Sequence, residues 1–327
     1  MSRIVSKLLQ LVCIAACAVA GATAAMAAAP SYPTKPIRII VLNSPGSGSD
    51  VLTRTIAGKI TEGLGQQVVI DNRAGGGGNA GMEIAARAVP DGYTLLMITS
   101  QQAIVVGLYD RLNYDIERDY APISLIGTTP LVLVTNLGVP AASIRDLIAL
   151  AKAKPGQINY GSPGSGSSGH LAAELFRHMA GVNLVHVPYK GATPALTDTM
   201  GGQVQLTLFV APIAMPMVKA GKLRALGVTT AKRTPLAPDV PAIAETLPGY
   251  EWSGWYGLVA PAGTPRDIVA KLNAVQVNAL KTPEFSERLF GMGTNIVGST
   301  PQEYAAHIRR EVVKMREAIK LSGARAD

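Results

Sequence analysis

The chain has 327 residues, a net charge of +8 and only two cysteines. Apolar residues make up 48% of it and charged residues 16%, so it is too apolar to be disordered. The basic residues are spread along the chain rather than grouped with aromatic residues, which argues against nucleic-acid binding. Two cysteines and four histidines exclude a cysteine-rich metal module and a disulfide framework. At this length we expect two domains.

The first 27 residues are predicted to be a cleavable export signal rather than part of the fold. Arg3 and Lys7 precede an uncharged apolar run over residues 8–20, and Ala25-Met26-Ala27 fits the small-residue cleavage rule. The alternative, a transmembrane anchor, needs about 20 apolar residues and usually larger ones. We therefore expect a periplasmic protein.

Both cysteines, Cys13 and Cys17, lie inside this segment. The predicted mature chain has no thiol, which suits an oxidising compartment and leaves no cysteine nucleophile or thiolate metal ligand. Ile14-Ala15-Ala16-Cys17 also resembles a lipobox, so lipid anchoring at Cys17 is the alternative. Ordinary cleavage is favoured because the small-residue cleavage region lies beyond Cys17.

The remaining sequence alternates strand, loop and helix. The apolar run 37–42 is typical of a strand buried on both faces of a parallel sheet. Further strands are predicted at 68–70, 93–98 and 158–160, with helices from near Asp50, over 80–88 and through Ala180. This repetition predicts an α/β fold with doubly wound sheets.

Three downstream helices are predicted from their start signals. Ser143, Thr264 and Thr300 each stand three residues before an acidic residue, as a capping hydroxyl does, and two of them are followed by proline. The predicted helices cover 143–153, 266–280 and 302–321.

The chain has no long polar linker, so we expect its two domains to be joined by strands that cross between them. The candidate crossing strands are 131–134 and 257–260. The first domain would then be discontinuous, with residues 32–129 plus 256–327, and the second would cover residues 130–255.

The strongest functional signal is a pair of Gly/Ser loops, at 44–50 and 161–168. Each joins the end of a predicted strand to the start of a helix, which is where open α/β sheets bind ligands. Helix-start N–H groups have no partner within the helix and favour an anion. The alternative is that both loops are tight turns with good helix caps, but their pairing favours a ligand site.

Other chemistries receive little support. Gly164–Gly169 matches G-x-G-x-x-G, yet the next strand has no acidic residue at its end, as a dinucleotide site requires. No P-loop and no G-x-S-x-G elbow occurs. His170, His178 and His186 lack a supporting carboxylate spacing, so packing or surface roles are favoured over a metal site. Asp50 either complements the helix dipole or faces the ligand, and the sequence leaves both open.

Several segments carry a family resemblance. Residues 32–38, leading into Ser44-Pro45-Gly46, resemble the opening of mature Bug-type proteins, the extracytoplasmic solute receptors of tripartite tricarboxylate transporters. Similar segments follow in order at 71–79, 90–96, 167–172, 186–191, 220–226 and 255–265. The resemblance therefore spans essentially the whole predicted mature chain.

The resemblance implies a Venus-flytrap periplasmic binding protein, in which two α/β domains close on a small organic anion. It implies no catalytic residue, no metal and no cofactor, and a ligand carboxylate held by the two strand-to-helix loops. Carried over by position, the binding residues would be Ser44, Gly46, Ser47, Ser49, Asp50, Gly164, Ser165, Gly166, Ser167 and Ser168, with Ser100 and Thr193 in addition.

Two departures from the family pattern bear on the ligand. Many members have Asp or Asn after the strand end Leu208-Phe209, where this chain has Val210, and the missing acid weighs against amino-acid ligands. Asn43 and Ser47 replace an apolar residue and a glycine. A dicarboxylate or aromatic carboxylate fits this combination.

We therefore expect a monomeric receptor that delivers its ligand to the membrane permease subunits of a tripartite transporter. Two alternatives stay open. One is an exported α/β hydrolase or dehydrogenase, and the other is a ligand-sensing receptor for a membrane kinase.

Overall fold

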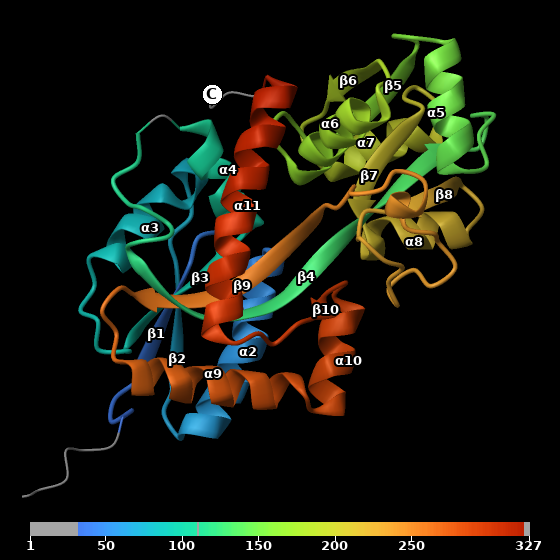
Figure 1. The fold of residues 1–327 in the computed structure, drawn as a ribbon. Coiled ribbons are helices and arrows are strands. Elements are labelled where there is room, and N and C mark those ends of the chain that lie inside the picture. Colours follow the sequence, from blue (N-terminus) through green and yellow to red (C-terminus); the bar gives the residue numbers. More distant parts are fainter. Residues whose placement is uncertain (1–31, 110, 324–327) are drawn as a thin grey trace, which may run out of the picture. The chain divides into compact units, whose positions relative to one another are not determined.

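Aliphatic and β-branched runs form the strands of the structure, and each predicted strand–loop–helix unit is present (Figure 1). The structure is a computed structural model that describes residues 32–109 and 111–323. The predicted export signal at 1–27 and both cysteines lie outside these residues. Of these, residues 36–109 and 111–323 belong to one compact unit, and the description below concerns that unit.

The described residues form ten strands and a series of connecting helices. The strands are β1 (Ile37–Val41), β2 (Val68–Asn72), β3 (Thr94–Thr99), β4 (Tyr120–Asn136), β5 (Ile158–Ser162), β6 (Leu184–Pro188), β7 (Leu206–Val210), β8 (Leu223–Val228), β9 (Ser253–Pro261) and β10 (Asn295–Ile296). The α-helices are α2 (Gly48–Leu64), α3 (Asn79–Ala86), α4 (Ser100–Leu108), α5 (Ile144–Ala153), α6 (Ser168–Ala180), α7 (Ala192–Met200), α8 (Ala211–Lys219), α9 (Arg266–Leu280), α10 (Pro283–Gly291) and α11 (Pro301–Ser322). Two short 3₁₀ turns lie at Gly76–Gly78 and Ile243–Glu245.

The strands fall into two parallel sets that share the same construction. β1 lies between β2 and β3 and is parallel to both, and β5 lies between β6 and β7 in the same way. Each central strand is followed by a glycine–serine loop and a helix, α2 after β1 and α6 after β5. The two loops predicted to bind ligand therefore leave the carboxyl ends of equivalent strands.

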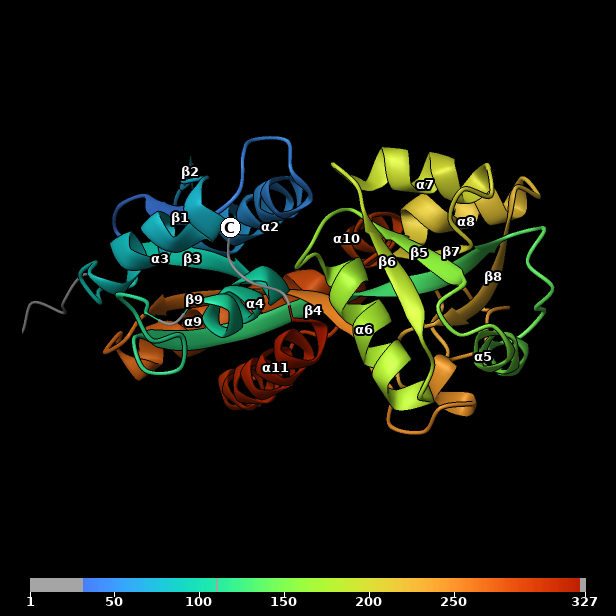
Figure 2. The same ribbon diagram turned by 90° about the horizontal axis from the view of Figure 1, so that it is seen from above.

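One long strand takes part in both sets. β4 pairs with β9 from Tyr120 to Pro130, then with β7 and β8 from Leu131 to Asn136. All of these pairings are antiparallel, as is the pairing of β3 with β9. Figure 2 shows β4 running from β9 to the strands of the second set. The two predicted crossing strands are thus parts of β4 and β9.

Helix starts follow the local signals in two cases of three. Ser143 Oγ accepts a hydrogen bond from the N–H of Asp146 (3.1 Å), and Thr300 and Glu303 form a capping box. The prediction that Thr264 caps α9 is wrong, because Pro265 holds the cap position and makes no side-chain bond. The hydroxyl of Thr264 instead donates to the carbonyl of Pro261 (2.8 Å) and closes the turn after β9.

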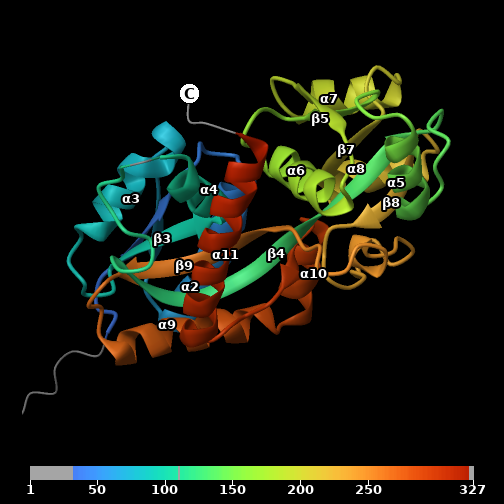
Figure 3. The same ribbon diagram turned by 45° about the horizontal axis from the view of Figure 1, so that its top comes forward.

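Helix α11 packs against elements of both strand sets. It contacts α4 and β4 as well as α6, and Figure 3 shows it beside these elements. Its buried positions include Tyr304, Ile308, Glu311, Val312 and Met315. In the described part of the chain, no helix combines the length and the apolar character that crossing a membrane would require.

Candidate functional site

The loop after β1 is built around the first turn of α2. Ser47 is the N-cap residue, in extended conformation, and its hydroxyl oxygen accepts a bond from the N–H of Asp50 (3.3 Å). Gly46, with a φ of +82°, adopts a left-handed backbone conformation that side chains rarely take. The hydroxyl of Ser49 donates to Asn43 Oδ1 (2.8 Å) and lies 3.3 Å from the hydroxyl of Ser47. The loop thus presents two serine hydroxyls and a helix N-terminus together.

Asp50 holds this loop in shape. It is only 2% exposed, and its carboxylate accepts bonds from the N–H of Gly46 (2.9 Å), from Asn72 Nδ2 (2.9 Å) and from Arg54 (3.0 Å). The Arg54 guanidinium, with help from the Gly46 and Asn72 donors, lowers the pKa of Asp50 to about 2 against the opposing effect of burial. Because these three donors belong to the protein itself, the side chain of Asp50 stabilises the conformation of the loop.

A cavity of about 280 Å³ opens beside this loop. It brings together three of the predicted binding residues, Ser47, Ser49 and Ser100. The other lining residues are Asn43, Gly48, Thr99, Gln101, Gly254, Trp255 and Tyr256. None of the ten carries a formal charge, so the polar groups of this cavity are hydroxyls, amides and backbone dipoles.

A second helix begins at the same cavity. Thr99 ends β3 and forms a capping box with Gln102, so the N–H of Gln101 bonds Thr99 Oγ1 (3.2 Å) and the N–H of Thr99 bonds Gln102 Oε1 (2.9 Å). The N-termini of α2 and α4 therefore both lie at this cavity, and each carries partial positive charge. Two such ends at one uncharged cavity favour an anion.

The loop after β5 repeats the backbone of the first. Its N-cap, Ser167, has φ −69° and ψ 157°, and Ser47 has φ −66° and ψ 160°. Ser167 follows Gly166, another glycine with positive φ, at +73°. The hydroxyl of Ser167 accepts a bond from the N–H of His170 (3.4 Å). Two loops far apart in sequence thus present the same serine-capped helix start.

Two histidines support this second loop from behind. His170 Nδ1 accepts a bond from the N–H of Gly166 (3.0 Å), and His186 Nε2 lies 2.7 Å from the hydroxyl of Ser162. Ser162 in turn accepts a bond from the N–H of Gly164 (3.2 Å). Burial, followed by the nearby His186, lowers the pKa of His170 to about 4. His170 is therefore neutral near pH 7, as its role as an acceptor requires.

The remaining predicted site residues lie apart from the cavity lining. Ser168 is bonded by Trp252, whose indole N–H donates to its hydroxyl (2.7 Å). Ser165 and Ser44 are exposed, and Thr193 is exposed in the first turn of α7. No residue of the 161–168 loop lines the 280 Å³ cavity. The structure therefore brings together part of the predicted set, and the role of the second loop stays a prediction.

Besides Asn43 and Gly48 at the first loop, the predicted binding set lacks five lining residues: Thr99, Gln101, Gly254, Trp255 and Tyr256. A signal for the first existed, because Thr99 and Gln102 follow a strand with the three-residue spacing of a capping box. The residues of β9 had no such signal. They reach the cavity because β9 pairs with β3, which places Gly254 beside the hydroxyl of Ser100.

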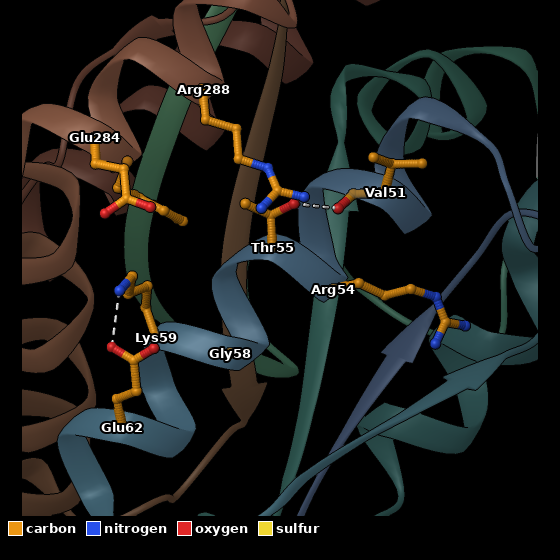
Figure 4. Close-up of a pocket in the computed structure, with 9 residues that line it drawn as sticks. Val51, Arg54, Thr55, Gly58, Lys59, Glu62, Glu284 and Arg288 are labelled. Carbon is orange, nitrogen blue, oxygen red and sulfur yellow. Dashed lines mark hydrogen bonds and ion pairs between the residues drawn. The ribbon is translucent and has the colours of Figure 1, made fainter.

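A larger groove, of about 510 Å³, lies between α2 and α10. Figure 4 shows charged side chains of both signs along it, with Lys59 bonded to Glu62 (2.8 Å) and Arg288 reaching toward Thr55. The mixed charge gives this groove no preference for an anion. Among residues 32–109 and 111–323, no group of three metal-ligating side chains comes together.

Comparison with known proteins assigns the family. A family model described as the tripartite tricarboxylate transporter family receptor matches residues 52–323. The chain belongs to this receptor family. The family resemblance and the α/β binding-protein fold predicted from the sequence are thereby confirmed.

The similarity to known relatives covers most of this chain and most of theirs. BugT of Bordetella pertussis is 36% identical, over 93% of this receptor and 95% of its own chain. Among solved structures, R. palustris Rpa4515 with adipate is 36% identical, covers 90% of this receptor and 99% of its own chain, and has a TM-score of 0.72. MatC from Rhodopseudomonas palustris with bound malate is 29% identical, covers 88% and 100%, and has a TM-score of 0.70.

Proposed function

We propose that this receptor binds a small organic carboxylate, with a dicarboxylate favoured, at the 280 Å³ cavity. The observation that supports this most directly is the meeting of the α2 and α4 N-termini at a cavity lined by Ser47, Ser49 and Ser100. Their N–H groups and the hydroxyls of Ser47 and Ser100 are donors suited to a carboxylate, whereas the hydroxyl of Ser49 already donates to Asn43. The cavity offers no carboxylate of its own to a ligand ammonium, and Asp50 is already occupied, which disfavours amino acids.

We further propose that the second loop completes the site when two domains close. The domains are residues 32–129 plus 256–327 and residues 130–255. The change of β4 partners at Pro130 and Leu131 supports this division, and the matching N-caps at Ser47 and Ser167 support equivalent roles for the two loops. A ligand that engages both loops would shift an open–closed equilibrium toward the closed state.

Two solved relatives support the ligand class. Rpa4515, at 36% identity, is described with adipate, and MatC, at 29%, with bound malate, so both bound molecules are dicarboxylates. We propose that this receptor works in the periplasm after export. It would deliver its ligand to the membrane subunits of a tripartite transporter as a monomer, without a cofactor.

A receptor is favoured over a hydrolase by the geometry of the serine–histidine contact. The hydroxyl of Ser162 lies 2.7 Å from His186 Nε2, but Ser162 is fully buried. Its hydroxyl donates to the carbonyl of Gly164 and accepts the N–H of the same residue. His170 already accepts the N–H of Gly166. Neither histidine is therefore placed to activate an accessible serine.

The test is a ligand screen on the exported, processed protein. Thermal unfolding is measured with adipate, malate, benzoate, citrate, glutamate and AMP, followed by calorimetric titration of any compound that stabilises. A ligand at a hundredfold excess over Kd adds about 2.7 kcal/mol to the free energy of unfolding. Stabilisation by adipate or malate, the dicarboxylates without an ammonium group, supports the proposal. Stabilisation by AMP or glutamate alone would contradict it.

A further inference from the structure

Both tryptophans of the chain lie next to the two Gly/Ser loops, 44–50 and 161–168 (the anion loops). Trp252 directly precedes β9 and Trp255 lies three residues further on, within the strand; they are 0% and 1% exposed. The indole N–H of Trp252 donates to Ser168 Oγ (2.7 Å), in the first turn of α6. Trp255 lines the cavity at the other loop, together with Ser47. One short segment therefore reaches both parts of the site.

Helix α11 holds the two indole rings through a single ion pair. Glu311 Oε2 accepts the indole N–H of Trp255 (3.0 Å), and Glu311 also pairs with Lys314. The Lys314 ammonium lies 5.8 Å from the centre of the Trp252 ring, a cation–π distance. Glu311 and Lys314 are three residues apart, so they share one face of the helix. The chain of contacts runs from the cavity to Ser168 without a break.

Glu311, which links these contacts, is buried. Glu311 is 5% exposed, and a buried carboxylate is stable only while its donors stay in place. Its donors are the Trp255 indole and the Lys314 ammonium. His307 packs edge-on against Trp255, with ring centres 5.2 Å apart. Burial first, then Lys314 and Arg310, lower the pKa of His307 to about 4, so it brings no competing charge near pH 7.

We propose that the Glu311–Lys314 pair is a positioning device for ligand binding. It fixes Trp255 against the cavity and Trp252 against Ser168. A displacement of one loop is thereby transmitted to the other. Neither residue is among the cavity lining, and their effect on affinity is through the tryptophans. The effect on affinity rests on the proposed function, whereas the effect on the loop does not.

The first experiment needs no ligand. Hydrogen–deuterium exchange is followed in the ligand-free protein at the amides from Gly164 to Ser168, in E311Q, K314Q and the control E317Q. Glu317 is exposed on the same helix, so E317Q makes the same chemical change without touching either tryptophan. We expect E311Q and K314Q to raise exchange at these amides about threefold or more, and E317Q to leave it unchanged. Unchanged exchange in both variants overturns the inference.

The second experiment measures affinity for adipate and malate by calorimetry. Couplings between sites typically change affinity about 5–150-fold, and we expect losses in the lower part of that range for E311Q and K314Q, with none for E317Q. W252F should weaken binding to a similar degree, and adding K314Q to it should produce little further loss. Wild-type affinity in E311Q and K314Q contradicts the inference.

The outcomes separate the two proposals. If the wild-type protein binds neither dicarboxylate, the proposed ligand class fails, and the exchange experiment still decides the role of the ion pair. If E311Q does not fold, K314Q carries the test, because its side chain is 27% exposed and its loss leaves the buried indole bond to Glu311 in place.

Discussion

The imidazole rings of His170 and His186 lie face to face behind the second loop, with centres 3.9 Å apart and planes 9° from parallel. Tyr160 extends the stack, 4.9 Å from His186. Protonating either ring would place a charge against its neighbour in a buried site. The two residues come from α6 and β6, so the stack ties the loop to the sheet as well as to its own helix.

This stack predicts a loss of stability in mild acid. The groups facing His170 are His186, Glu174, Arg177 and Tyr160, and burial is the main cause of its lowered pKa of about 4. Because the folded pKa lies below the ordinary 6.5, the stabilisation is complete above pH 6.5 and is lost as the pH falls toward 4. Between pH 7 and 5 we expect His170 to lower the free energy of unfolding by about 2 kcal/mol.

Urea unfolding at pH 7 and pH 5 tests this expectation. H170Q cannot titrate there, so its stability should fall less over this interval than that of the wild type. H178Q is the matched control, because His178 is exposed on the same helix and holds no part of the loop. An H170Q protein as acid-sensitive as the wild type would show that the stack does not govern this loss.

Replacing Asp50 should reveal a structural role. D50N keeps the shape of the side chain but removes the charge that pairs with Arg54 and accepts the N–H of Gly46. We expect D50N to lower the free energy of unfolding by about 1–2 kcal/mol at pH 7. The loss is kept small because Arg54 is half-exposed, so solvent screens its ion pair with Asp50. Since the pKa of Asp50 is lowered to about 2, its contribution is present above pH 3.8 and is lost as the pH falls through 2.

Thermal and urea unfolding measure this difference, with E62Q as the control on the same helix. Glu62 pairs with Lys59 at the surface and should contribute less than about 0.5 kcal/mol. If Asp50 orders the loop through Arg54, R54Q should produce much of the same loss, and the double variant little more. Additive losses would argue that the two side chains act separately.

Serine caps at the two loops should affect binding, whereas an equivalent cap elsewhere should not. S47A, S167A and S143A each remove a hydroxyl that caps a helix and each should cost about 1 kcal/mol of stability. Only S47A and S167A remove a donor from a proposed anion loop, so we expect each to weaken dicarboxylate binding about tenfold. Calorimetric titration measures this. Equal affinities in all three variants would exclude these hydroxyls from the site.

Glycine at position 169 is required by the packing of α6 against β7. A Cβ there would lie 2.7 Å from the carbonyl oxygen of Leu208, a backbone atom that cannot rotate away. We expect G169A to lower the free energy of unfolding by about 1–3 kcal/mol and to displace the adjoining loop. G58A is the control within α2, where a Cβ meets nothing within 4 Å and should add about 0.5–1 kcal/mol. Urea unfolding of both variants measures whether the free energy of unfolding falls in G169A and rises in G58A.

The sequence alone determined the features that depend on near neighbours in the chain. The order of strands and helices, the two serine-capped loops and the starts of α5 and α11 follow from apolar runs and from capping residues a few positions apart. The family motifs lie within short segments and were recognisable for the same reason. The spacing around Thr264 predicts a helix cap wrongly, because a turn and a helix start compete for the same hydroxyl and local spacing does not decide between them.

Only the tertiary structure decided how distant residues share a site. The cavity needs β9 beside β3, which brings Trp255 and Gly254 to Ser100. Two donors to Asp50, Gly46 and Arg54, are four residues away, and only the third, Asn72, lies 22 residues away and depends on the tertiary structure. The partners of Trp252 and Trp255 lie 84 and 56 residues away. Such contacts arise from the packing of whole elements, and no spacing along the chain encodes them.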